Sequence, residues 1–133
     1  MAVVGFADLN VYKSLYSAML RVHKEVLPKL PSGEKFGLVD QAGRASKSPC
    51  ALIAEGYARR QFGKEWKKYL REAMGECNEM IVHMSMVRDL YGGLVGIDLC
   101  NELISVYDVS GKQLYRLGES WDTTHNPQLI TQT

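Results

Sequence analysis

Apolar side chains recur at steps of three and four residues through most of this 133-residue chain. That spacing places them on one face of an α-helix. The pattern predicts four helices, which run from about Asn10 to Leu27, Phe36 to Ala58, Lys64 to Leu90 and Asp98 to Trp121. No strand-like alternation and no internal repeat interrupts them. Four amphipathic helices with short connections favour an all-α fold, an up-down-up-down antiparallel four-helix bundle.

Proline and glycine divide the chain between these helices. Pro28 and Pro31 are expected to stop the first helix, because proline lacks the backbone N–H that a helix interior needs. Gly92 and Gly93 are expected to end the third, since glycine accepts the positive φ of a C-terminal cap. Pro49 lies inside the second helix and predicts a kink there without a break. Residues 1–121 are therefore predicted to form one domain, and residues 122–133, which lack periodicity, a flexible tail.

Charge is distributed unevenly along the chain, although the formal net charge is only +1. Residues 1–71 carry 13 Lys and Arg against 6 Asp and Glu, and residues 72–133 carry 3 against 9. The first part is thus +7 and the second −6. One interpretation is an electrostatic role for the basic half. The other is that opposite charges face each other between helices or between subunits.

Six basic residues cluster around the predicted start of the third helix, with one acid, Glu65, among them. They are Arg59, Arg60, Lys64, Lys67, Lys68 and Arg71. The last four share a helix face by their three- and four-residue spacing. Phosphate backbones favour such a face through counterion release. The rings of Tyr57, Trp66 and Tyr69 interleave with the charges, and exposed rings stack on unpaired bases. The competing interpretation is a solvated basic face with its aromatic rings in the core.

Metal, redox and membrane chemistry find little support in the sequence. Cys50, Cys77 and Cys100 stand far apart among apolar neighbours, and we interpret them as small apolar residues in a reducing cytosol. No cluster of ligands suggests a metal site, and no cofactor is predicted. No signal segment is expected at the N-terminus, and no apolar run approaches the ~18 residues that span a membrane.

Glu55 and Gly56 end the second predicted helix. Glu55 follows an apolar run, so it is expected to be partly buried and to need a partner. Arg59, one turn further on, or an amide at the start of the third helix would serve. A catalytic role is disfavoured, because no base, nucleophile or metal ligand accompanies the carboxylate. Gly56 is expected to permit close contact between helices.

Four short motifs occur in order along the chain. The first is F-x-D-L-x-V-[WY] at residues 6–12, and the second is F-G-L-x-x-Q at residues 36–41. The third, I-A-E-G-[FY]-x-R, covers residues 53–59. The fourth, K-E-[FYW]-x-x-[FY]-L, begins at Lys64 and is followed by Ala73, Gly75 and Glu79. From Phe6 to about Trp121 the chain thus resembles the four-helix bundle family encoded in the intervening sequences of bacterial 23S ribosomal RNA genes.

The chain departs from the family pattern at three positions of the second helix. The family usually has proline where this chain has Cys50, often asparagine where it has Leu52, and an apolar residue where it has Lys47. The resemblance implies a cytoplasmic, non-enzymatic homo-oligomer, with a pentamer of bundles as the family-like assembly. A related group is the accessory protein of diversity-generating retroelements, also a pentameric four-helix bundle, which works with a reverse transcriptase and nucleic acid.

Two functional hypotheses follow. The first is an oligomeric bundle whose basic face binds RNA, including ribosomal RNA, or DNA with little base specificity. The alternative is a protein-interaction scaffold that partners a reverse transcriptase. A small-molecule enzyme is a distant third and would require a deep polar pocket with several convergent ionisable side chains.

Overall fold

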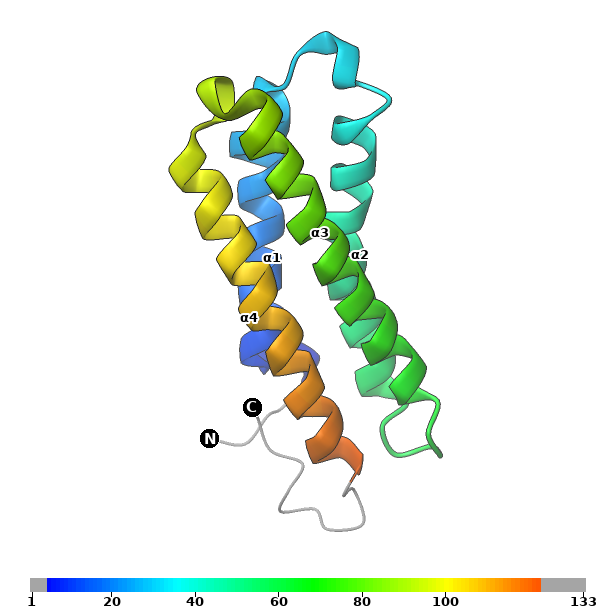
Figure 1. The fold of residues 1–133 in the computed structure, drawn as a ribbon. Helices are drawn as coiled ribbons and strands as arrows, with labels where there is room; N and C mark the ends of the chain where they lie inside the picture. The colour runs from blue at the N-terminus through cyan, green and yellow to red at the C-terminus, as the bar shows by residue number, and fades with distance from the viewer. Residues whose placement is uncertain (1–4, 123–133) are drawn as a thin grey trace.

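The computed structural model describes residues 5–122 of the chain. Four long helices form it: α1 (Asn10–Arg21), α2 (Leu38–Ala58), α3 (Trp66–Val95) and α4 (Ile97–Asp122). They run alternately up and down, as Figure 1 shows, and α3 packs along both α2 and α4 while α1 contacts α2 and α4. No strand occurs among residues 5–122. The predicted antiparallel four-helix bundle is confirmed.

The first helix was predicted to run to Leu27, but its α-helical part, α1, ends at Arg21 and the backbone then changes to other helical geometries. A 3₁₀ turn, η1 (Phe6–Asp8), precedes α1, and a π-helical turn, η2 (Val22–Val26), continues it. The short turns η3 (Leu27–Lys29) and η4 (Ser32–Glu34) then lead to α2. Pro28 lies in the first turn of η3, where a backbone N–H would have no helical partner in any case. The first helix therefore ends close to Pro28, as predicted.

The second helix begins at Leu38, two residues after the predicted start. Gly37 has φ −105° and ψ −110°, outside the helical region, and Phe36 is 84% exposed. The carboxylate of Glu34 accepts a hydrogen bond from the Leu38 N–H at 3.1 Å and so caps one of the unpaired amides at the helix start. Helix α2 then continues through buried Pro49 to Ala58. The kink at Pro49 remains a prediction.

The third helix is interrupted just after its predicted end at Leu90, but it does not stop there. Tyr91 leaves helical geometry, with φ −132° and ψ 22°, but the helix resumes and reaches Val95. Gly96, with φ +108°, ends it, so glycine does provide the terminus but at a later position. The hydroxyl of Tyr91 donates to Glu34 Oε2 at 2.5 Å and lowers the pKa of that carboxyl. This bond ties the irregular turn of α3 to the segment that caps α2.

The fourth helix extends slightly beyond its predicted bounds at both ends. It begins one residue before Asp98 and includes Asp122, which had been assigned to the tail. Residues 123–133, the rest of the predicted tail, lie outside the described residues. Trp121 is 1% exposed, so the end of α4 belongs to the core.

Burial controls the chemistry of the cysteines. All three are free thiols, and desolvation raises the pKa of Cys50 to about 11 and that of Cys77 to about 12. Burial also raises the pKa of Cys100. A thiol in an apolar environment stays protonated because the interior stabilises the thiolate poorly. The interpretation of these residues as small apolar side chains agrees with their burial.

We expect the folded protein to resist thiol modification at pH 8. The thiolate is the reactive species, so a rise in pKa from ~8.5 to about 11 lowers the reactive fraction of Cys50 by roughly two orders of magnitude. Ellman's reagent should label the native chain far more slowly than the chain in denaturant. Because the folded pKa is raised, stability should also fall as the pH rises from ~8.5 towards 11. Equal labelling rates in the two states would contradict this expectation.

Candidate nucleic-acid interface

The predicted basic cluster lies at one end of the bundle, where α2 ends and α3 begins. Residues 59–65 make the connection, and backbone hydrogen bonds fold it into tight turns. The Phe62 N–H donates to the Arg59 carbonyl at 3.0 Å, and Gly63 adopts φ +66°, a conformation that favours glycine. Lys64 precedes α3 and is not within it, although the Lys67 N–H donates to its carbonyl at 3.1 Å. The cluster is therefore built from a loop and the first turns of a helix.

An aromatic cluster supports this connection from inside. The rings of Trp66 and Trp121 meet edge to face with centroids 5.7 Å apart, and Tyr57 meets Trp121 at 6.1 Å. Trp66 is 3% exposed, so for this ring the core interpretation holds and the base-stacking interpretation does not. Tyr57 and Tyr69 are only partly buried. The two tryptophans join the start of α3 to the end of α4 beneath the loop.

Both loop arginines lie against tyrosine rings. The guanidinium carbon of Arg60 lies 3.7 Å from the centroid of Tyr57, and its Nη1 donates to the Tyr57 carbonyl at 2.7 Å. The guanidinium carbon of Arg59 lies 5.3 Å from the ring centroid of Tyr69. Such stacking is favoured by the negative face of an aromatic ring. It holds two long side chains in defined positions, which lowers the entropy that a ligand would otherwise have to remove.

Two of the six basic side chains are neutralised by carboxylates. Arg59 donates to Glu55 at 3.3 Å and approaches Glu65 at 3.9 Å, and Lys67 pairs with Asp122 at 3.2 Å. Exposed ion pairs of this kind contribute little to stability, about 0–1 kcal/mol each. They do, however, reduce the positive charge that these two residues present to a ligand.

The other four basic side chains of the cluster are not paired with a carboxylate among the described residues. Within residues 5–122, no carboxylate lies in ion-pair distance of Arg60, Lys64, Lys68 or Arg71. Lys64, Lys68 and Arg71 are exposed and follow one another at steps of four and three residues. That spacing keeps Lys68 and Arg71 on one side of α3, with Lys64 leading into it. The structure therefore reduces the predicted six-residue cluster to a four-residue group with unpaired charge.

The two residues that end α2 have separate roles. Glu55 pairs with Arg59 as predicted, but its side chain is 54% exposed, so the expected partial burial is wrong. Gly56 is buried, and a Cβ there would lie 3.4 Å from Tyr69 Cβ and 3.6 Å from atoms of Leu70 and Trp121. These are ordinary van der Waals distances, so the end of α2 packs against α3 and α4 here, and the expected need for glycine at this contact stays a prediction.

A comparison with models of known protein families shows to which family the chain belongs. The model described as 23S rRNA-intervening sequence protein matches residues 7–120. The chain belongs to the 23S rRNA-intervening sequence protein family. Comparisons with curated proteins and with solved structures gave no significant match. The matched range contains the whole basic cluster, so the candidate interface lies within the region that the chain shares with the family model.

Phe62 is the residue at this interface that sequence reasoning missed. It is 68% exposed, whereas of the aromatic residues that flank the loop, Tyr57 is partly buried and Trp66 is buried. A signal was present in the sequence: an aromatic residue stands in the polar run Arg59-Arg60-Gln61-Phe62-Gly63-Lys64, where no helical face is available to bury it. In this family member the exposed ring therefore lies in the same loop as Arg60 and Lys64.

Two further features, a metal-ligand group and a membrane-spanning helix, are absent from residues 5–122. No group of three or more His, Cys, Asp or Glu side chains there is arranged to hold a metal ion. None of the helices in that range is long and apolar enough to cross a membrane.

Proposed function

We propose that this 23S rRNA-intervening sequence protein is a non-enzymatic oligomer that binds nucleic acid through the face formed by Arg60, Lys64, Lys68 and Arg71. One observation carries the proposal: these four cations cluster at one end of the bundle with no carboxylate partner among residues 5–122. Unpaired cations grouped in this way attract a polyanion, because each phosphate contact releases a condensed counterion. RNA is the first polyanion to test, since the family takes its name from 23S rRNA.

The proposed face has little means to read a base sequence. Specific readout in a duplex requires an element that enters a groove and places hydrogen-bonding side chains at base edges. Here the cations project from a loop and the side of α3, and the two helix-end carboxylates, Glu55 and Glu65, are engaged by Arg59. Contacts to phosphates set position but carry no sequence information. We therefore expect broad tolerance of sequence.

Self-association is the second part of the proposal. Along the distal half of α3 and into α4, an apolar ridge remains open in the single chain, with members 46–64% exposed. The ridge consists of Val82, Met86, Leu90, Leu94 and Ile97. Val82, Met86 and Leu90 lie at steps of four residues, the row that packs into the groove of another helix, and Leu94 follows the irregular turn at Tyr91. We propose that further copies of the chain cover this ridge, with the pentamer implied by the family resemblance as the assembly. Repetition of a weak basic face in an oligomer increases affinity through avidity.

Mass measurement followed by salt-titrated binding tests both parts. Light scattering should give a mass several times that of one chain. Binding of labelled RNA should then weaken steeply as salt rises, by a slope of about −0.7 in log K against log salt for each phosphate contacted on a single strand. A monomer would contradict the assembly. Binding that is absent or independent of salt would contradict the nucleic-acid role, and would favour the scaffold that partners a reverse transcriptase.

A further inference from the structure

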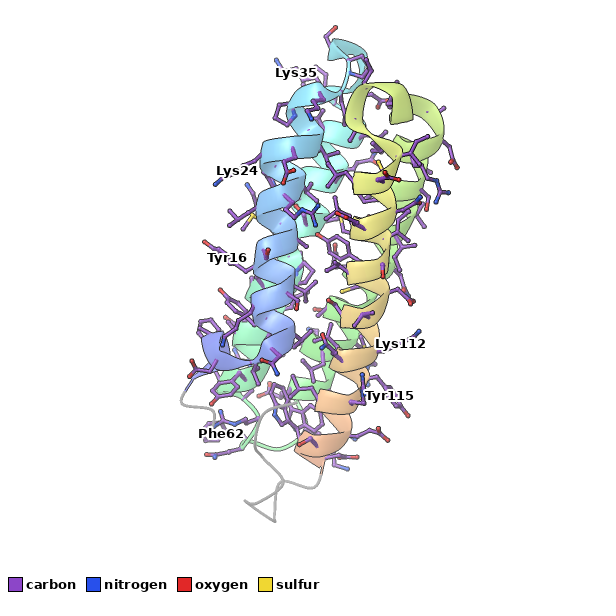
Figure 2. All side chains as sticks on the ribbon, turned by 90° about the vertical axis from the view of Figure 1, so that its left-hand side faces the viewer. Tyr16, Lys24, Lys35, Phe62, Lys112 and Tyr115 are labelled. Atoms are coloured by element: carbon purple, nitrogen blue, oxygen red, sulfur yellow. The ribbon has the colours of Figure 1, made fainter. Side chains whose placement is uncertain are left out.

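An aromatic ring is held in solvent at the centre of the basic loop. Figure 2 shows Phe62 at one end of the bundle, and it is 68% exposed in a segment where residues 61–65 are all exposed. The turn that carries it is fixed by the hydrogen bond from the Phe62 N–H to the Arg59 carbonyl and by the positive φ of Gly63. Exposing an apolar ring in this way costs free energy that burial would recover. A ligand that covers the ring would remove this unfavourable exposure and so gain binding free energy.

The chemistry around Phe62 indicates what that ligand is. Between residues 59 and 71 no other large apolar side chain is exposed, and the loop neighbours of the ring are basic or polar, so it does not belong to an apolar patch in this segment. An anchor for a protein partner normally lies at the centre of a surface that excludes water. A nucleobase suits this surrounding better, because it offers a flat apolar face attached to a phosphate that the neighbouring cations attract.

We propose that Phe62 stacks on an unpaired base while Lys64, Lys68 and Arg71 contact the flanking phosphates, so that this face selects single-stranded nucleic acid over duplex. This inference rests on the proposed function of the same face. In a duplex each base is covered on both sides by its neighbours, and its flat face is closed to a side chain. In a single strand the face is free, and every base has one, so the contact selects for strandedness without selecting for sequence.

The two loop arginines extend the same surface. The guanidinium groups of Arg59 and Arg60 lie over the rings of Tyr69 and Tyr57. Arginine planes, like aromatic rings, are surfaces on which unstacked bases lie. Because these planes are already fixed by their tyrosines, a strand that meets Phe62 finds neighbouring stacking positions in place. The loop thus combines stacking surfaces with phosphate contacts, as proteins that bind single strands do.

The test compares Phe62→Ala with Phe36→Ala. Phe36 is a matched control, because it is also an exposed phenylalanine beside a cation, Lys35, whose Nζ lies 5.4 Å from its ring centroid. Lys35 lies at the opposite end of the bundle from Phe62 (Figure 2). Three probes of about 12 nucleotides, within the usual range of single-strand site sizes, serve as ligands: oligo-U RNA, oligo-dT DNA and an RNA duplex of equal length. Circular dichroism should confirm that both variants remain helical.

Loss of one stacked base should weaken single-strand binding of Phe62→Ala at least about fivefold. Its duplex binding should stay within about twofold, and Phe36→Ala should bind all probes like the unaltered protein. Equal losses on oligo-U and oligo-dT are expected, because stacking does not involve the 2′-hydroxyl. A Phe62→Trp variant should keep its affinity and show tryptophan fluorescence quenched by the single strands and not by the duplex.

The outcomes separate this inference from the function on which it rests. If the unaltered protein binds none of the probes in a salt-dependent way, the proposed function itself fails. If it binds them but Phe62→Ala loses affinity equally for single strand and duplex, or loses none, the stacking role is wrong while the phosphate-binding face survives. An unchanged affinity in Phe62→Ala, with no quenching in Phe62→Trp, would make the ring a contact for a protein instead.

Discussion

Replacement of Lys64, Lys68 and Arg71 together by glutamate is expected to abolish salt-dependent RNA binding and leave the helical content intact. All three side chains are exposed, and none has a carboxylate partner among residues 5–122, so their reversal breaks no ion pair within the described fold. Loss of about three phosphate contacts should reduce the salt slope on a single strand by about 2. Repulsion between the new carboxylates and the phosphates should lower affinity further, to at least about 100-fold in total.

Lys67 is left unchanged in this variant for a structural reason. It pairs with Asp122 at 3.2 Å and links the first turn of α3 to the end of α4, so its reversal would place two carboxylates together. The matched control reverses Lys24, Lys29 and Lys35, which are exposed towards the other end of the bundle and change the net charge by the same amount. An equal loss of binding in the control would show that net charge, and not this face, determines affinity.

Replacement of Trp121 by alanine is expected to lower the free energy of unfolding by about 3–5 kcal/mol. The indole is almost completely buried and contacts the rings of Tyr57 and Trp66, so its removal leaves a cavity bounded by three helices. Domains of this size are commonly stable by only about 5–15 kcal/mol, so the variant should unfold at a much lower urea concentration.

A suitable control lies on the same helix. Tyr115 is 59% exposed, and its replacement by alanine should change stability by no more than about 0.5 kcal/mol. Urea unfolding followed by circular dichroism gives both values. If the two variants unfolded at the same urea concentration, the buried aromatic cluster would not contribute to the stability of the bundle as its burial indicates.

The bundle could be predicted from the sequence because its helices obey a simple period. The apolar positions of α3, such as Leu70, Cys77 and Met84, recur at seven-residue intervals, and all are buried. The ends of the helices were less predictable. Gly92 and Gly93 were expected to end α3, but a glycine pair permits a terminus without requiring one, and the helix passes the irregular Tyr91 and ends at Val95 before Gly96. Local propensity does not reveal which of several glycines the tertiary contacts select.

The candidate interface could be predicted only as a set of charges. Sequence spacing grouped the cations and offered Arg59 as a partner of Glu55, but it could not show that Lys67 is engaged by a carboxylate, because Asp122 lies on a different helix. It also did not identify which aromatic ring is exposed. Trp66 completes an amphipathic face and packs against Trp121, whereas Phe62 lies in a loop outside any period. Periodicity identifies what a helix buries, but it says little about side chains in the turns between helices.

The alternation of helix directions has a practical consequence for labelling this protein. Helix α1 starts, and α4 finishes, at the same extremity of the molecule as the loop of residues 59–65 (Figure 1). A fusion partner joined directly before η1 or directly after α4 would therefore lie at the same extremity as the proposed strand-binding loop. A fluorophore introduced at Ser32, in the short exposed turn between α1 and α2, would report from the remote extremity and leave that loop clear.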